Sequence, residues 1–463
     1  MSALEKRASA SLASIYALRM AGLFMILPVF ALYAEQLEGH TPTLVGLAVG
    51  IYGLTQAALQ IPFGMLSDRF GRKPVIASGL LIFAIGSVIA AMADSIYGVI
   101  FGRALQGAGA IAAAIMALTA DLTREEHRVK AMGMIGVSIG LSFAVSLVAG
   151  PVVSRWIGVD GIFWLTAVLA LGGIWVLYKV VPTPSSSRFH RDAQPVPNQF
   201  RTVLRDEELL RLDAGIFILH MVLTATFVVM PLALRDHAGL APEHHWWIYL
   251  PVLLIAMVVM VPFVVLAESR RKMKQVFVGS IFVLVLAELI LMGDSDSVYA
   301  VFGALLLFFI AFNVLEATLP SLIVKVAPPD IKGTAMGVYS SSQFLGAFLG
   351  GLAGGMIYGA FGYNSVFLFA AVMLLLWLAL AVTMRNPRYL GSLMLRVGPV
   401  SEERANELVL ALTSITGVAE AVVIAEEGVA YLKVDNKALD REALMRYRWQ
   451  GDAPEKADDG DGK

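Results

Sequence analysis

The sequence predicts an all-α polytopic membrane protein of twelve helices, arranged as two parallel six-helix repeats and followed by a C-terminal α+β ferredoxin-like domain. Three observations predict this fold class. Of the 463 residues, 58% are hydrophobic and 15% charged, whereas an average soluble domain is roughly 25% charged. Long apolar stretches fall into two sets of six. Lys and Arg residues gather on one side of the alternating connections between them.

The apolar stretches define the two halves. A helix needs about 20 apolar residues to cross the hydrocarbon core of a membrane. Such stretches occur near 11–33, 43–66, 75–93, 96–119, 131–154 and 161–181, and again near 209–234, 246–267, 276–292, 298–326, 335–358 and 364–384. We therefore expect one six-helix half over residues 1–181, a polar linker over 182–208 and a second half over 209–384.

The connections carry their positive charge unevenly. Counted alternately, they hold nineteen Lys and Arg residues on the side of the N-terminus and only two, Arg155 and Arg235, on the other side. Cytoplasmic loops of membrane proteins are enriched in Lys and Arg. The count therefore predicts an even number of crossings, with both termini and the linker in the cytoplasm.

The two halves also repeat each other in sequence. Residues 61–75 (IPFGMLSDRFGRKPV) align with residues 261–275 (VPFVVLAESRRKMKQ), which places Glu268 opposite Asp68 at an offset of 200 residues. The sequence Ala-Met-Gly at 131–133 recurs at 335–337. An even number of helices in each half keeps both copies in one orientation, so we expect a parallel repeat.

From Arg385 the composition becomes that of a soluble domain. The pattern predicts a strand at 392–397, a helix at 402–413, two strands at 418–425 and 429–434, and a helix at 440–448. This βαββα order predicts a cytoplasmic ferredoxin-like domain over residues 385–450, with its final strand absent or unrecognised. The polar, acidic residues 451–463 are predicted to be disordered.

The composition excludes several classes of function. A formal net charge of −1 argues against a nucleic-acid partner, and the absence of Cys excludes disulfides, thiolate metal sites and Cys nucleophiles. No Walker-type glycine loop and no Ser-His-Asp order occurs in a soluble segment. We expect no enzyme activity, no cofactor and no primary active transport. The pair His244-His245 beside Trp246 and Trp247 fits an interfacial aromatic belt better than a metal site.

The connection after the second apolar stretch carries the strongest motif. Its named positions are Gly64, Asp68, Arg69, Gly71, Arg72 and Lys73. Gly64 allows a close helix approach, Gly71 permits a tight turn, and Asp68 stands where it can meet the positive N-terminus of another helix. A purely topogenic loop would explain the basic residues but not the acid between two glycines. Here the sequence resembles the major facilitator superfamily, whose signature loop has this form.

The resemblance implies a twelve-helix major facilitator fold, the inner (cytoplasmic) membrane, and transport by alternating access. It also implies that Asp68 latches the cytoplasmic ends of the two halves against the start of the eleventh helix, and that Arg72 pairs with Asp121. That helix begins near Ala335. It continues with a small-residue face at four-residue spacing, Gly346, Gly350 and Gly354.

Two further motifs resemble the superfamily. Arg103 and Gln106, followed by glycines in the fourth helix, resemble a motif associated with proton-coupled members. Gly150 and Pro151 in the fifth helix resemble the Gly-Pro motif of antiporters, and Pro151 can kink the helix. The usual trailing glycines are missing at 152–154. Simple helix packing is therefore nearly as good an explanation for this second motif.

Intramembrane polar residues complete the candidate site. Arg19, His220 and Glu316 lie within apolar stretches, where a charge is costly and marks a pathway or a buried partner. With Arg103 and Gln106 they form the candidate pathway for protons or substrate. Both His220 and Glu316 could exchange a proton. The alternatives are a structural, hydrogen-bonded His220 and a snorkelling Arg19; Glu288, near the outer end of its helix, is expected to snorkel too.

The sequence thus predicts a secondary active transporter, with proton-coupled export of a small molecule as the leading hypothesis. Its expected partners are that substrate, protons and the lipid bilayer. The alternative is a transporter-derived membrane sensor that signals through its C-terminal domain. Regulation, self-association and small-ligand sensing all stay open for that domain.

Overall fold

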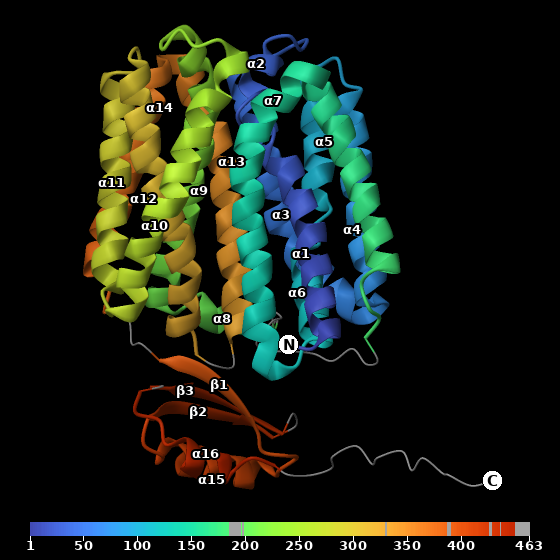
Figure 1. The fold of residues 1–463 in the computed structure, drawn as a ribbon, viewed down its shortest axis with the longest axis vertical. Helices are drawn as coiled ribbons and strands as arrows, with labels where there is room; N and C mark the ends of the chain where they lie inside the picture. Colours follow the sequence, from blue (N-terminus) through green and yellow to red (C-terminus); the bar gives the residue numbers. More distant parts are fainter. Residues whose placement is uncertain are drawn as a thin grey trace, which may run out of the picture.

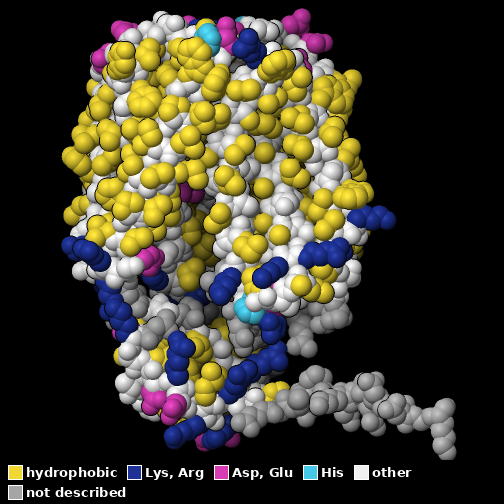
Figure 2. All heavy atoms as spheres, in the orientation of Figure 1, with side chains coloured by type: hydrophobic (Ala, Val, Ile, Leu, Met, Phe, Trp, Pro, Cys, Tyr) yellow, Lys and Arg dark blue, Asp and Glu magenta, His cyan; other side chains and the backbone are white. Residues whose placement is uncertain are grey.

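The computed structural model describes residues 1–184, 196, 199–328, 331–386, 390–425, 428–435 and 437–449. Long helices run side by side in a bundle, and a small sheet domain lies beyond one end of it (Figure 1). Lys and Arg side chains gather around the end nearest the small domain (Figure 2). We call this end, which carries Arg69, Arg72 and Arg270, the basic end, and the opposite end, which carries Glu35 and Arg235, the far end.

The first half of the bundle ends in a very long helix. Its elements are α1 (Ala3–Phe24), α2 (Phe30–Ala34), α3 (Pro42–Phe70), α4 (Arg72–Ala91), α5 (Ile96–Ala108), α6 (Ala112–Leu122) and α7 (Glu125–Lys179). The 55 residues of α7 include one non-helical position, Gly158, with φ of 72°. Glycine adopts this left-handed backbone without a steric penalty. The two limbs of α7 reverse direction there, and both run along the bundle (Figure 1).

The second half follows a short helix in the linker. Its elements are α8 (Phe200–Val203), α9 (Glu207–Asp236), η2 (Pro242–His244), α10 (Trp246–Ser269), α11 (Met273–Gly293), α12 (Val298–Val326), α13 (Lys332–Phe361) and α14 (Tyr363–Thr383). Across the described residues, ten helices are long and apolar enough to cross a membrane, with α7 counted once and α1 not counted. In the most apolar stretch of α9, 94% of the residues are buried. This helix therefore forms the core of the second half.

The small domain follows the predicted βαββα order. It consists of β1 (Gly391–Arg396), α15 (Glu402–Thr413), β2 (Val418–Ile424), β3 (Val429–Val434) and α16 (Arg441–Met445). The antiparallel sheet has the order β1-β3-β2. Leu395 and Leu432 on one face of the sheet pack with Leu408, Leu412 and Leu444 of the two helices. Of the predicted elements, the last helix differs most, because it ends at Met445. The tail at 451–463 lies outside the described residues.

The first turn of α1 joins the N-terminus to the start of α7. Ser2 and Glu5 form a capping box, in which each side chain accepts a hydrogen bond from the backbone N–H of the other. Glu5 Oε1 also accepts hydrogen bonds from Arg124 N at 3.0 Å and Arg124 Nε at 3.1 Å. The Arg124 guanidinium therefore holds the pKa of Glu5, which precedes the apolar part of α1, well below its usual range.

This depressed pKa predicts an acid-sensitive contact. The folded-state pKa of Glu5 is the lower one, so its stabilising contribution is present above the pKa of an unfolded Glu and is lost as the pH falls toward the folded value. We expect Glu5→Gln to lower the Tm by about 1–3 °C at neutral pH and to match the parent protein in acid. Thermal unfolding of both proteins over an acid series tests this. A difference in Tm that does not change with pH would contradict it.

Candidate functional site

The motif loop between α3 and α4 forms a charge cluster at the basic end. Gly71 has φ of 91° and makes the turn. Arg72, 4% exposed, follows it and forms an ion pair with Asp68. Arg72 Nε also lies 3.3 Å from Asp121 Oδ2, and Nη1 donates to Ser67 Oγ at 2.7 Å. The two residues that the family resemblance pairs, Arg72 and Asp121, therefore do lie together.

Gly64, Lys73 and Arg69, the other side chains and glycine of the motif, make contacts outside this charge cluster. A Cβ on Gly64 would lie 2.9 Å from Ala113 Cβ, so α3 and α6 approach closely here. Lys73 Nζ donates to Val181 O at 2.7 Å and to Thr183 Oγ1 at 3.1 Å, which ties the loop to the end of α7. The guanidinium of Arg69 lies over the ring of the next residue, Phe70. The motif therefore braces the basic end of the first half in this conformation.

The far end is closed by contacts between the halves. Arg235 of α9 donates two hydrogen bonds to Glu35, which follows α2, at 2.6 and 2.9 Å. Behind this ion pair, α3 and α13 meet backbone to backbone, since a Cβ on Gly46 would lie 2.1 Å from Gly351 O and one on Gly355 would lie 2.3 Å from Pro42 O. Only glycine fits at such contacts. We call these Gly46, Gly351 and Gly355 contacts the far-end seal.

From the far-end seal toward the basic end, α3 and α13 stay close, since a Cβ on Gly53 would lie 2.4 Å from Phe344 O. Gln60 Nε2 of α3 donates to Ser341 Oγ of α13 at 2.7 Å, about a third of the way along both helices from the basic end. The halves separate between this contact and the basic end. Figure 2 shows the surface hollowed between the two halves on the side of the basic end. The partner of Asp68 in this structure is Arg72, on the following helix. The conformation is therefore open at the basic end and closed at the far end.

In the first half, two buried guanidinium groups flank one tyrosine. Arg19 of α1, 1% exposed, donates to Gln56 Oε1 at 2.5 Å, and its Cζ lies 5.5 Å from the centre of the Tyr52 ring. Arg103 of α5 has its Cζ 5.2 Å from the same ring and donates to Gln106 Oε1 at 2.8 Å. Arg19 is therefore a core residue stacked on aromatic rings, and the alternative that it snorkels is wrong.

Gln106 extends this first-half cluster toward α4. Its Nε2 donates to Ser87 Oγ at 2.8 Å, and Thr166 Oγ1 of α7 donates to the same Ser87 oxygen at 3.2 Å. Arg103 Nε reaches Ala48 O of α3 at 3.4 Å. Arg103 and Gln106 thus link four helices of the first half.

In the second half, three helices bring a carboxyl and an imidazole together. His220 Nε2 of α9 lies 3.5 Å from Glu316 Oε1 of α12 and 2.8 Å from Gln343 Nε2 of α13. His220 Nδ1 lies 3.3 Å from Ile216 O. The side chain of Glu316 is 32% exposed and that of His220 is 12% exposed. The two residues predicted to exchange protons are therefore in contact. Part of the Glu316 side chain is exposed, whereas Oε1 is buried and has no hydrogen-bond partner among the described residues.

Two further buried carboxyl groups lie in the second half. Asp213 of α9 is 4% exposed, and neither of its carboxylate oxygens has a hydrogen-bond partner among the described residues. Glu288 of α11 is fully buried and accepts a hydrogen bond from Thr226 Oγ1 at 2.8 Å. The expectation that Glu288 snorkels is therefore wrong.

The sequence interpretation missed Asp213, although a signal for it exists. It precedes His220 by seven residues, or two helical turns, so both side chains lie on one face of α9. The neighbouring charges Glu207, Glu208 and Arg211 make this segment resemble an ordinary helix end. The seven-residue spacing distinguishes Asp213 from those charges.

The glycine and proline motifs pack helices together. A Cβ on Gly150 would lie 2.4 Å from Met25 O, so α7 closely approaches the end of α1. Backbone dihedral angles of α7 remain helical at Gly150 and Pro151 and depart from helical values at Gly158. The expected small-residue face of α13 packs on α9: Cβ atoms on its members would lie within 2.9 Å of α9 backbone atoms, at Gly346, Gly350 and Gly354.

No group of three or more metal-ligating side chains occurs in the part of the chain that the structure describes. The ring of His244 lies 4.2 Å from that of Trp247, centre to centre. This arrangement is typical of an interfacial aromatic cluster.

Comparison with known proteins relates the chain to a family of transporters. The sequence profile of the Major Facilitator Superfamily matches residues 12–351 and, in a second match, 274–412. The chain is 48% identical over 437 residues to the inner membrane transport protein YajR of Escherichia coli (strain K12), covering 94% of this chain and 96% of that protein. It is 26% identical over 347 residues to the multidrug resistance protein MdtH of Yersinia enterocolitica, covering 73% and 83% of the two chains.

A solved structure has the same fold. The inward-facing, occupied form of a bacterial homologue of the human lysosomal transporter Spinster superposes with a TM-score of 0.70 at 14% identity, covering 82% of this chain and 97% of that chain. With the profile match and the YajR relationship, this fold establishes the family. The chain is a multi-pass membrane transporter that belongs to the Major Facilitator Superfamily.

Proposed function

We propose that the protein is a secondary active transporter that exports a small molecule across the inner membrane in exchange for protons. The observation that carries this proposal is the contact between Glu316 and His220, 3.5 Å apart inside the second half of the bundle. A carboxyl group in a membrane interior is costly unless it is protonated, paired or facing water. If Glu316 gains and loses a proton during each transport cycle, it is protonated at one stage and is paired or faces water at the others.

The hydrogen bonds around His220 favour a neutral imidazole. With Nδ1 donating to Ile216 O and Nε2 accepting from the Gln343 amide, the ring carries one proton. Nε2 has a single lone pair, so a protonated Glu316 can donate to it only in place of the Gln343 amide, and the two donors compete for this nitrogen. Loss of its proton leaves a carboxylate that attracts a proton or a cation from the hollow between the halves. The pair thus responds to the proton gradient at the place where the two halves separate.

The proposal includes a membrane topology of twelve crossings. The first is made by α1 with α2, the fourth by α5 with α6, and the fifth and sixth by the two limbs of α7. Long helices α3, α4, α9, α10, α11, α12, α13 and α14 make the remaining eight. The excess of Lys and Arg at the basic end supports a cytoplasmic location for both termini and the small domain.

The small domain is proposed to have a ferredoxin-like fold. Trp449 N donates to Arg396 O at 2.8 Å, so the chain returns beside β1, where the fourth strand of such a fold lies. The relatives support the direction of transport: the name of MdtH, a multidrug resistance protein, describes protection from compounds. Export by this chain is inferred from that similarity together with the proton-exchanging pair.

Flux measurements test the proposed function. Compounds that raise the Tm of the purified protein would first be identified in a ligand screen. Those compounds would then be followed in proteoliposomes with an imposed pH gradient, with no gradient, and with a membrane potential alone. Proton-coupled export requires flux that follows the pH gradient and reverses when the gradient is reversed. Equal flux with and without a pH gradient would exclude proton coupling.

Asp68→Asn tests the proposed latch at the basic end. When this end closes, Asp68 is expected to meet the N-terminus of α13, which begins at Lys332. A neutral amide interacts less favourably with a helix N-terminus, by roughly 0.3–2 kcal/mol. We therefore expect Asp68→Asn to increase the population that is open at the basic end.

Cross-linking of engineered Cys pairs across the basic end measures this population, because the chain has no Cys of its own. Asp94→Asn, at an exposed position near the far end, is the matched control. Cross-linking yields that are the same for Asp68→Asn, Asp94→Asn and the parent protein would eliminate the latch.

A further inference from the structure

The small domain turns one face of its sheet toward the basic end of the bundle (Figure 1). The opposite face packs on α15 and α16 through Leu395 and Leu432. Side chains alternate between the two faces of a strand, yet β3 is buried at all six positions from Val429 to Val434. Both faces of its central strand are therefore covered, and the bundle contributes to the second cover.

Lys433 makes the central polar contact of this second face. It is 4% exposed, and its Nζ donates to Lys325 O at 2.8 Å and to Val326 O at 3.1 Å. Glu420 Oε2 of the neighbouring strand lies 3.8 Å from the same nitrogen. The ammonium group therefore lies between its own sheet and the bundle, with acceptors on both sides.

The two carbonyl groups belong to the last two residues of α12. The final carbonyls of a helix have no partner within the helix and carry the negative end of its dipole. A buried ammonium group in turn needs hydrogen-bond acceptors, because burial without them is costly. The ammonium group of Lys433 thus donates hydrogen bonds to the carbonyls at the end of α12, and these carbonyls are the acceptors that a buried ammonium group needs. The contact is stronger than a surface ion pair.

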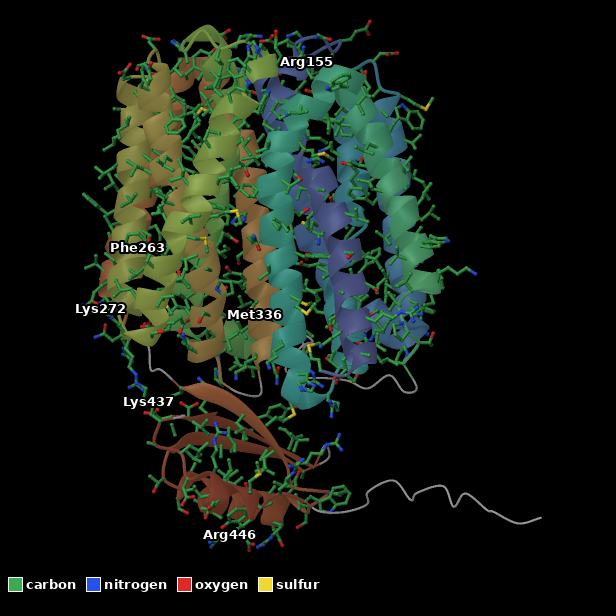
Figure 3. All side chains as sticks on the ribbon, viewed as in Figure 1. Arg155, Phe263, Lys272, Met336, Lys437 and Arg446 are labelled. Atoms are coloured by element: carbon green, nitrogen blue, oxygen red, sulfur yellow. The ribbon has the colours of Figure 1, made fainter. Side chains whose placement is uncertain are left out.

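A second contact lies nearby. Arg271, between α10 and α11, lies 3.4 Å from Asp435 Oδ1, just after β3. Their side chains are 44% and 35% exposed, so water and salt weaken this pair. Figure 3 shows Lys272 of the bundle above Lys437 of the small domain, on the same side of the molecule. Both contacts thus reach the second half, and Lys433 makes the stronger one.

We propose that Lys433 is a positioning residue: it clamps the small domain onto the end of α12, the helix that carries Glu316, and holds α12 in the position that it takes when the basic end is open. This inference rests on the proposed alternating access, in which α12 shifts relative to the first half. Any state that breaks the clamp leaves a buried ammonium and two helix-end carbonyls without these partners. The intact clamp therefore favours the open basic end.

Spin-label distances measure the balance between the two conformations without a known substrate. One pair of labels, at Phe70→Cys and Thr383→Cys, spans the two halves at the basic end. A second pair, at Tyr97→Cys and Tyr299→Cys, spans them at the far end, where both side chains are exposed. The 463-residue sequence contains no Cys of its own that would also be labelled. Electron double resonance in lipid nanodiscs then gives the fraction of molecules with an open basic end.

Lys433→Met removes the ammonium group and keeps the length of the side chain. We expect the ratio of basic-end-open to far-end-open molecules to fall by about ten-fold, since a hydrogen bond from a charged group contributes about a factor of ten. Lys433→Arg, which can still donate to both carbonyls, is expected to restore most of the ratio. Lys437→Met, at an exposed lysine of the same domain, is the matched control and is expected to leave the ratio unchanged.

Hydrogen exchange at the amides of β3 reports whether the small domain of Lys433→Met is folded. If it is folded and the ratio is unchanged, or if Lys437→Met lowers the ratio equally, the clamp is refuted. If it is unfolded, Lys433→Gln decides, because the polar Gln side chain also lacks the ammonium group; an unchanged ratio in a folded Lys433→Gln protein also refutes the clamp. A single conformation in every variant, with the parent protein included, would instead count against alternating access.

Discussion

Glu316→Gln is expected to reduce gradient-driven transport by at least about a hundred-fold, the usual scale for losing a positioned acid–base group. The amide keeps the shape of the side chain and its contact with His220, 3.5 Å away in the parent protein, but it cannot release a proton. Substrate should therefore still bind, whereas flux should no longer respond to pH. Flux into proteoliposomes, measured over a pH series for both proteins, tests this expectation.

Glu288→Gln is the matched control for this change. Glu288 lies in the same half and is fully buried, but its carboxyl accepts a hydrogen bond from Thr226 and is not paired with a histidine. We expect this variant to lose thermal stability and to keep the pH dependence of its remaining flux. A Glu316→Gln protein with the pH profile of the parent would remove Glu316 from the mechanism and leave it a structural role.

Gly46→Ala is expected to prevent closure of the far end. The added Cβ would lie 2.1 Å from Gly351 O, and a backbone carbonyl cannot move aside as a flexible side chain can. Overpacking of this kind costs about 1–3 kcal/mol, which is enough to shift the population strongly toward the far-end-open form. The spin labels at Tyr97 and Tyr299 should report the longer distance in most molecules.

Gly136→Ala is the control for the far-end substitution. It makes the same change within a long helix, α7, where a Cβ would meet no atom within 4 Å, so its distance distribution should match that of the parent protein. A short far-end distance in Gly46→Ala would show that the far end still closes with the added Cβ between α3 and α13. The far-end seal would then not control access.

Much of the fold follows from the sequence because length and apolarity determine a membrane helix. The break at Gly158 was expected, since 154 and 161 bound two apolar stretches, and the structure reverses α7 there. The division between α5 and α6 was not expected. It occurs at Gly109, where a Cβ would lie 2.2 Å from Gly79 O. The hydrophobic periodicity around Gly109 does not indicate such a close approach to another helix.

The intramembrane charges of the candidate pathway can be recognised in the sequence, but the residues that they contact cannot. An isolated charge in an apolar stretch is visible in the sequence, which is why Arg19, Arg103, His220 and Glu316 could be singled out. Their partners come from other helices, and only packing brings Gln343 to His220 or Tyr52 between the two guanidinium groups. Asp213 was missed because other charges surround it in the sequence, although they do not in space.

The far-end seal is made of main-chain atoms, and this has a consequence for how such a protein can diversify. The rim pair of Arg235 and Glu35 is solvent-exposed, so salt weakens it. Contacts between glycine backbones carry no charge and respond little to ionic strength. Closure of the far end is thus largely independent of the ionic strength of the surrounding medium. It is also independent of the side chains that face the hollow, so natural selection can alter which compounds are recognised without rebuilding the gate.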